Sequence, residues 1–326
     1  MSVLPKDQNE QARCPSGIGL VLLDLDGTIV SGGTHVSERV RRSLVRAHER
    51  GVALVVSSGR PYHMVPRSIR ELGVMDYYVC TNGSVVNDRA GERIFSRGFD
   101  PASATRIMGM LEHLRPGWNV FVGDEGYAEV RNHTYMIGGA TGAAGSAGTG
   151  GAAGSDGAVG ADGGAGAGGG AGALRAVASV ARFALAIVAG PGFHERLSVR
   201  GVVRHADQVD KMGCSFASER AADEACALLS AESFVEVVRM TPLELEITAA
   251  GVDKGSGASW LADRLGVSRE ATVGFGDGAN DLPLVGAVGR FVAMGNADDE
   301  VKAVASETCP TIDEDGVAQW LDAHVG

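Results

Sequence analysis

Short, continuous apolar runs recur along this sequence, and stretches with helical periodicity separate them. The runs are Gly19–Leu23, Val52–Val56, Tyr77–Cys80, Ala271–Phe275 and Arg290–Ala293. Runs of this length without polar alternation are typical of strands buried on both faces of a parallel sheet. Segments 37–50 and 256–265 carry helical patterns, and a glycine follows each of them. The alternation predicts an α/β fold with a doubly wound, mostly parallel sheet.

The middle of the chain interrupts this pattern. Residues 86–247 contain candidate strands and helices without the regular alternation. We therefore expect an inserted α+β domain there, with residues 18–85 and 248–326 forming one core. The core and the insertion together predict a two-domain molecule.

Two segments have compositions that disfavour folding. In residues 138–173, 29 of the 36 residues are Gly or Ala, so the segment lacks the apolar side chains that would offset the entropy of ordering. We predict a disordered loop of the inserted domain there, because a long structureless loop inside a packed sheet is implausible. Residues 1–17 are polar and mixed in charge, and we expect a disordered N-terminal tail.

Composition narrows the possible partners. The net charge of −11 argues against nucleic acid as a partner, because a phosphate backbone requires a basic surface. The five cysteines are scattered, which disfavours a disulfide scaffold and a structural zinc site. The first residues lack the basic and apolar regions of a signal peptide, and no apolar stretch reaches the ~20 residues of a membrane span. We therefore expect a cytoplasmic protein that does not bind membranes.

A pair of carboxylates directly follows the first apolar run, in the segment Asp24-Leu25-Asp26-Gly27-Thr28. Residues two apart on an extended chain face the same way, so both carboxylates can address one ligand. Two carboxylates this close repel each other unless a cation lies between them. Oxygen ligands of this kind suit Mg²⁺. Surface turns also contain such pairs, but the position after a buried strand favours a functional site.

Two further motifs are ambiguous by themselves. Ser58 lies in the Ser-Ser-Gly-Arg segment 57–60 at the end of the second run, where a hydroxyl and main-chain N–H groups can hold phosphate oxygens or cap a helix. Lys254 lies at an expected helix start. A cation is disfavoured at that end of a helix, which indicates an anionic partner, although the local sequence alone favours simple exposure.

The segment Gly276–Asp281 follows the apolar run that ends at Phe275. It combines two glycines, the carboxylates of Asp277 and Asp281, and the amide of Asn280 in one turn. The spacing excludes an EF-hand and a dinucleotide-binding fingerprint. Metal binding is the interpretation that this combination favours.

These motifs share one position relative to the predicted sheet. Asp24, Ser58 and Asp277 each follow the carboxyl end of an expected parallel strand. Ligands of open α/β sheets bind in the crevice at that edge. We therefore expect the motifs to meet in one pocket.

Together the motifs resemble those of the haloacid dehalogenase superfamily, and specifically its Cof-type phosphatases with an inserted cap domain. Serine replaces the usual threonine of the second motif. The matching segments are Asp24–Thr28, Ser58–Arg60, Thr81–Gly83, Lys254, Gly276–Asp281, Val292–Ala297 and Asp313–Gly316. The resemblance is weak through the cap, where the Gly/Ala segment departs from the family pattern.

The resemblance implies a magnesium-dependent phosphatase that acts on a small phosphorylated metabolite. Asp24 would be the nucleophile that forms an aspartyl-phosphate, and Asp26 would be the general acid and base. The implied Mg²⁺ ligands are Asp24, the main-chain carbonyl of Asp26, and Asp277, with support from Asp281. The phosphoryl group would be held by Ser58, Gly59, Asn82, Lys254 and Asn280.

Other functions remain open on the sequence. A phosphomutase or another phosphotransferase uses the same scaffold, and an inactive binding module is a further alternative. Sugar phosphates, phosphorylated flavin precursors and nucleotides are all compatible substrates. Polar cap residues could contact the leaving group, although a surface or structural role is favoured for each of them: His133, Tyr135, His205 and Glu244.

Overall fold

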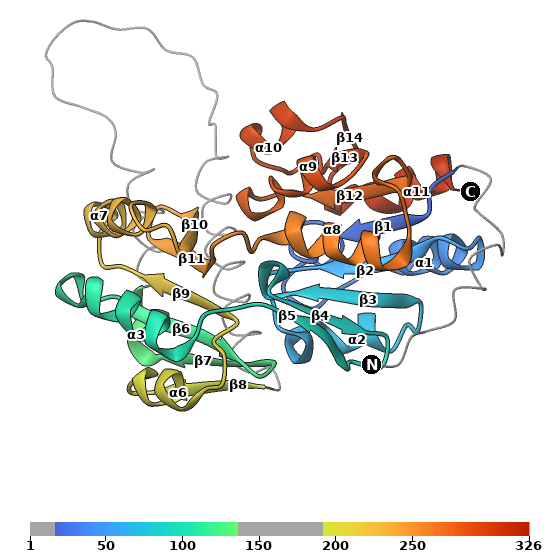
Figure 1. Cartoon of the computed structure of the whole chain (residues 1–326). Helices are drawn as coiled ribbons and strands as arrows, with labels where there is room; N and C mark the ends of the chain where they lie inside the picture. The colour runs from blue at the N-terminus through green and yellow to red at the C-terminus, as the bar shows by residue number, and fades with distance from the viewer. Residues whose placement is uncertain (1–16, 136–191, 326) are drawn as a thin grey trace, which may run out of the picture.

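The computed structural model describes residues 17–135 and 192–325. The expected N-terminal tail, apart from residue 17, and the expected disordered loop 138–173 lie outside the described residues. Within these ranges the strands form two separate sheets, of eight and of six strands (Figure 1). Each sheet has its own hydrophobic core. Among the helices of the described residues, none has the length and apolar character to cross a membrane.

The larger sheet joins the two ends of the chain. Its strand order is β14-β13-β12-β1-β2-β3-β4-β5, and pairing is parallel from β14 to β3. The bounds are β1 Leu20–Leu23, β2 Ala53–Ser57, β3 Met75–Cys80, β4 Val85–Asp88, β5 Arg93–Ser96, β12 Thr272–Gly276, β13 Arg290–Ala293 and β14 Glu307–Thr308. All four residues of β1 are buried, as expected for a central parallel strand with helices on both faces. The predicted α/β class with a mostly parallel sheet is confirmed.

Helices of this part begin and end where local chemistry favours it. In α1, the Ser37 hydroxyl accepts a hydrogen bond from the Val40 amide at 3.1 Å, which caps the helix. In α8, Asp253 and Ser256 form a capping box, and Gly266 ends the helix in a left-handed conformation. The helices are α1 Glu38–Glu49, α2 Arg67–Arg70, α8 Lys254–Leu265, α9 Leu284–Ala287, α10 Asp299–Val304 and α11 Gly316–His324. Short 3-10 helices are η2 Tyr62–Met64, η3 Thr81–Gly83, η5 Arg269–Ala271, η6 Ala279–Asp281 and η7 Ile312–Glu314.

The smaller sheet is built from the middle of the chain, in the order β10-β11-β9-β6-β7-β8. Its strands are β6 Gly117–Val122, β7 Glu125–Glu129, β8 Phe193–Arg196, β9 Lys211–Ser215, β10 Val235–Thr241 and β11 Glu244–Ala249. The accompanying helices are α3 Pro101–Met110, η4 Glu112–Leu114, α6 Arg200–His205 and α7 Glu219–Ser230. Figure 1 shows this green and yellow unit beside the blue and red unit of the larger sheet.

The sheet pairing differs from the expected domain limits at both ends of the insertion. β4 and β5 form an antiparallel hairpin that pairs with β3, so residues 86–96 belong to the larger sheet. β11 continues to residue 249, two residues beyond the expected end at 247. The two connections between the sheets contain Arg97 and Ala250. The Arg97 side chain donates a hydrogen bond to the Ala250 carbonyl at 3.1 Å, so the two connections lie side by side.

Candidate active site

The carboxyl ends of four neighbouring strands meet at one edge of the larger sheet. Asp24 follows β1 and Asp277 follows β12, and these two strands pair in parallel. Ser58 follows β2, and Asn82 lies in η3 after β3. Parallel pairing therefore brings together side chains that are far apart in the sequence, as the strand-end positions predict.

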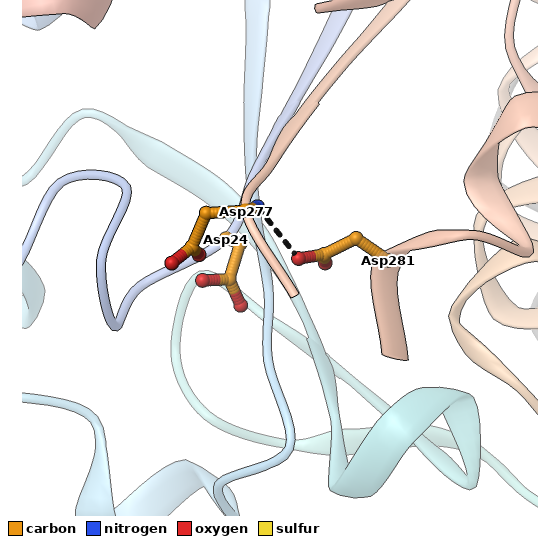
Figure 2. A group of neighbouring side chains, drawn as sticks. All are labelled: Asp24, Asp277 and Asp281. Atoms are coloured by element: carbon orange, nitrogen blue, oxygen red, sulfur yellow. Dashed lines mark hydrogen bonds between the residues drawn. The ribbon is translucent and has the colours of Figure 1, made fainter. Parts of the chain in front are cut away.

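Three carboxylates form an acidic group at this edge. One oxygen from each of Asp24, Asp277 and Asp281 lies within 4.8 Å of the others. Figure 2 shows the side chains of Asp24 and Asp277 next to each other, with Asp281 approaching from the segment after β12. Oxygen ligands in this arrangement suit a hard divalent cation such as Mg²⁺.

The electrostatics of the group also favour a cation. Burial raises the pKa of Asp24 well above its usual range, and the neighbouring carboxylates add to this effect against the opposing charge of Lys254. Burial and the charge of Asp281 raise the pKa of Asp277 to about 7. Three carboxylates thus face one ammonium group, and a divalent cation would balance the excess negative charge. The residues fit the implied Mg²⁺.

Lys254 is fully buried at the first position of α8. Its ammonium donates hydrogen bonds to Asp24 Oδ1 and to Asp281 Oδ1, both at 2.6 Å. Burial opposes the charged form, but the two carboxylates outweigh it and raise the pKa of Lys254. The anionic partners indicated by its position at a helix start are these two side chains.

Asp281 holds the loop after β12 in place. Its Oδ2 accepts hydrogen bonds from the main-chain amides of Asp277 at 3.0 Å and Gly278 at 3.1 Å, and Figure 2 marks the first of these. Its other oxygen binds Lys254. Both oxygens therefore have partners, which suits a residue that positions the metal-binding loop and the lysine.

Two glycines allow the loops to approach this closely. Gly27 has a φ of +83°, and a Cβ there would lie 2.0 Å from Asp277 Oδ2. Gly83 has a φ of +89°, and a Cβ there would lie 1.9 Å from the carbonyl oxygen of Asp253, at the start of α8. Any larger residue at these positions would push Asp277 or the start of α8 away.

The side chain of Asp26 pairs with Arg60 and is not one of the three grouped carboxylates. Its two oxygens accept hydrogen bonds from Arg60 Nε at 2.8 Å and Nη2 at 2.6 Å. Arg60 is itself buried and donates further bonds to the carbonyl oxygens of Gly33 and Met64. The expected metal ligand at Asp26 is its main-chain carbonyl, so this side-chain position does not conflict with it. Sequence reasoning quoted Arg60 within a motif but assigned it no role.

The remaining expected phosphate ligands lie around the end of β2. Ser58 is buried, and its main-chain carbonyl accepts a hydrogen bond from the Asn82 amide at 3.0 Å. Asn82 adopts a left-handed conformation with φ +55°, and its Oδ1 accepts a bond from Asn280 Nδ2 at 3.3 Å. A Cβ at Gly59 would lie 3.0 Å from that same oxygen. The structure therefore brings Ser58, Gly59, Asn82 and Asn280 together.

A cavity of about 250 Å³ opens beside the acidic group, between the two sheets. Asp24, Asp26 and Asp277 line one side of it. The smaller sheet and the helical segment that follows β7 supply the opposite side, with the following residues: Asn119, Phe121, Lys211, Glu244 and Glu246 from the strands, and His133 from the helical segment. Sequence reasoning missed Lys211 and Glu246, because only the strand pairing shows that they face the cavity.

The other cap candidates have local partners. The Tyr135 hydroxyl bonds to the Arg115 carbonyl at 3.4 Å. His205 Nδ1 lies 2.8 Å from the Gly201 carbonyl within its own helix. His133, which does line the cavity, has Nδ1 2.8 Å from a Glu195 oxygen. These contacts agree with the structural roles favoured for Tyr135 and His205.

Comparisons with known proteins cover both outer parts of the chain. A family model described as haloacid dehalogenase-like hydrolase matches residues 21–140 and 203–321. Phosphatase YwpJ of Bacillus subtilis (strain 168) is 25% identical over 302 residues, which covers 93% of this chain and 98% of that protein. The 5-amino-6-(5-phospho-D-ribitylamino)uracil phosphatase YcsE of the same organism is 22% identical over 305 residues, with coverage of 93% and 94%.

A solved structure supports the same fold. A haloacid dehalogenase-like hydrolase from B. subtilis matches with a TM-score of 0.72 at 20% identity, and the match covers 94% of this chain and 99% of that one. The family model alone matches well over half of the 326 residues, on both sides of the unmatched stretch 141–202. The chain belongs to the haloacid dehalogenase-like hydrolases.

Proposed function

We propose that this hydrolase is a magnesium-dependent phosphatase that cleaves a small phosphate monoester through an aspartyl-phosphate on Asp24. The observation that carries the proposal is the group of Asp24, Asp277 and Asp281 beside the cavity, in which Lys254 binds Asp24 and Asp281. The names of two relatives that align along most of this chain, both phosphatases, support it.

The metal has suitable ligands in this chain. The carboxylates of Asp24 and Asp277 and the main-chain carbonyl of Asp26 would hold Mg²⁺, with Asp281 fixing the loop that carries Asp277. When bound, Mg²⁺ supplies positive charge to the phosphoryl oxygens and reduces their repulsion from the attacking carboxylate.

In the first step, an Asp24 oxygen attacks phosphorus while the bond from phosphorus to the leaving oxygen breaks. Asp26 donates its proton to the leaving oxygen. In the second step, the Asp26 carboxylate accepts a proton from water, the water oxygen attacks phosphorus, and the bond to Asp24 breaks. The products are the alcohol and inorganic phosphate, and Asp26 regains its proton.

Arg60 constrains the step that Asp26 performs. Both Asp26 oxygens accept hydrogen bonds from Arg60 in the described structure. Each of these oxygens keeps a second lone pair, through which the carboxyl group could exchange a proton with the leaving oxygen. We assign Arg60 a positioning role, in which it orients Asp26 between the two proton transfers.

The phosphoryl oxygens also need donors that are already in place. The ammonium of Lys254, the Ser58 hydroxyl and the Asn82 and Asn280 amides would hold them, and the small residue Gly59 leaves space for them. Fixed donors of this kind are worth about 3–4 kcal/mol each in a transition state.

The direct test is phosphate release from p-nitrophenyl phosphate, with and without Mg²⁺. Asp24→Asn should lower kcat by at least about 1,000-fold, because it removes the nucleophile. Asp263→Asn, an exposed residue of α8, is the matched control and should retain activity. Rapid quenching followed by mass spectrometry should locate a phosphoryl group on Asp24. Full activity in Asp24→Asn, or in a chelator, would contradict the proposal.

A further inference from the structure

The face of the smaller sheet that lines the cavity has a defined row of side chains. Glu246 of β11 and Asn119 of β6 both lie opposite Gly213 of β9, and Lys211 lies opposite Phe121. Side chains two apart on a strand share a face, so Glu244 and Glu246 point to the same side. All of these residues except Gly213 line the cavity that holds Asp24.

Glu246 already has partners for its carboxylate. Lys211, which is 2% exposed, donates a hydrogen bond to one oxygen, and Asn82 Nδ2 donates to the other at 2.5 Å. Burial by itself would raise the pKa of Glu246, but the charge of Lys211 and the hydrogen bonds from Lys211 and Asn82 together outweigh burial and lower it. The Lys211 ammonium also lies 4.8 Å from the centre of the Phe121 ring. Glu246 and Lys211 therefore form a neutral pair within the protein.

The carboxyl group of Glu244 differs from that of Glu246 in its surroundings. Glu244 is half-buried, and among the described residues its carboxyl group has no hydrogen-bond donor and no cation within ion-pair distance. Burial and the neighbouring charge of Glu246 raise the pKa of Glu244 to about 7. The Glu244 oxygens are not among the fully buried atoms that lack a partner, so they stay open to the cavity. A ligand that brings a hydrogen-bond donor to this point would supply the partner that the described residues do not.

Resting on the proposed phosphatase activity, we propose that Glu244 is a specificity-determining residue that accepts hydrogen bonds from hydroxyl or amino groups of the leaving group. The phosphate end of a substrate would lie at Asp24 and Lys254, and the leaving group would extend across the cavity to the smaller sheet. Phe121 and the Lys211–Glu246 pair also line this space. The favoured substrates are small phosphate monoesters rich in donors.

The test compares three esters in the presence of Mg²⁺: glucose 6-phosphate, glucosamine 6-phosphate and p-nitrophenyl phosphate, whose leaving group carries no other donor. Glu244→Ala should lower kcat/KM for the two sugar esters by about 10- to 100-fold, because a buried recognition bond is lost. Its kcat/KM for p-nitrophenyl phosphate should stay within about threefold. Glu224→Gln, an exposed residue of α7, is the control and should change none of the three.

Glu244→Gln distinguishes the two donors. The amide keeps an acceptor oxygen but loses the charge, so recognition of a hydroxyl group should partly recover and that of an ammonium group should not. Equal losses on all three esters would show a structural role and overturn the proposal. A wild type that prefers p-nitrophenyl phosphate to both sugar esters would also overturn it.

Binding to Asp24→Asn separates this proposal from the proposed activity. Calorimetry would measure the affinity of that variant for glucosamine 6-phosphate and p-nitrophenyl phosphate, with and without Glu244→Ala. If Glu244→Ala weakens binding of glucosamine 6-phosphate but not of p-nitrophenyl phosphate, the result would support recognition by Glu244 even if the wild type had no turnover. No difference between the two esters would overturn the proposal, whatever the wild-type activity.

Discussion

Lys254 links two carboxylates that come from distant parts of the sequence. Asp24 lies 230 residues before it and Asp281 lies 27 residues after it. Its local sequence predicts an anionic partner but not which one, because the contact depends on the approach of α8 to β1. The sequence alone thus predicts that residues directly after buried strands belong to the site. Which of these residues contact one another depends on the tertiary fold.

Removing the Lys254 charge should affect both stability and activity. Lys254→Met leaves the Asp24 and Asp281 carboxylates buried without their cation, so we expect a loss of about 3–5 kcal/mol in the free energy of unfolding. Urea titration in a chelator would measure it. The double variant Lys254→Met with Asp281→Asn should recover part of the loss. An additive double variant would show that the two residues do not interact.

Replacing Arg60 would test whether this residue positions the Asp26 carboxyl group. Arg60→Gln should lower kcat by about 10- to 100-fold with little change in KM, because Asp26 would lose its orientation while the phosphate ligands remain. Arg67→Gln, whose side chain is exposed and pairs with Glu71, is the matched control. Steady-state kinetics on p-nitrophenyl phosphate would show the difference. A rise in KM with unchanged kcat would indicate substrate binding instead.

Glu244 should make stability depend on pH. Its pKa of about 7 exceeds the ordinary value of 4.5, so the folded chain keeps a proton that the unfolded chain releases. Its contribution to stability therefore falls as pH rises from about 4.5 to about 7. The side chain of Glu244→Gln stays neutral next to Glu246 and Lys211 at every pH. The urea midpoint of the variant minus that of the wild type should therefore be larger at pH 8 than at pH 5. An unchanged difference would contradict the raised pKa.

At the scale of elements, buried and half-exposed strands differed in how well they could be predicted. The apolar run 19–23 contains β1, and the run 271–275 overlaps β12, because both faces of these strands are covered. The hairpin β4–β5 was expected in the insertion. β5 is half-exposed along its length and has no apolar pattern, so nothing in its sequence assigns it to a sheet. Strand partners of this kind are fixed by tertiary contacts.

Gly83 determines how closely α8 approaches β3. Gly83→Ala places a Cβ 1.9 Å from the Asp253 carbonyl oxygen, so the start of α8 and Lys254 must shift. Gly73→Ala is a matched control, because Gly73 has a φ of +73° but no atom of the described residues lies within 4 Å of such a Cβ. Both variants should lose about 1–2 kcal/mol from the left-handed backbone. Only Gly83→Ala should lose more stability than this, which urea titration would show. It should also lower kcat, which steady-state kinetics would show.

At the scale of the molecule, the expected site residues all lie outside the Gly/Ala segment 138–173. Most of this segment also lies outside the regions that the family model matches. Deletion of residues 138–173 should therefore leave kcat for p-nitrophenyl phosphate unchanged. Loss of activity in a deletion variant that keeps its urea midpoint would assign the segment a part in catalysis.

The pairing of β1 with β12 sets an order for folding during synthesis. All strands of the smaller sheet precede residue 250, so that unit can form while later residues are still being translated. Until β12 is available, one edge of the apolar strand β1 keeps its main-chain N–H and C=O groups unpaired. A nascent chain that ends before residue 272 therefore carries Asp24 without Lys254 held beside it, and chaperones that bind exposed strands would act on the N-terminal segment. Asp24, Lys254, Asp277 and Asp281 can therefore come together only after residue 281 has left the ribosome.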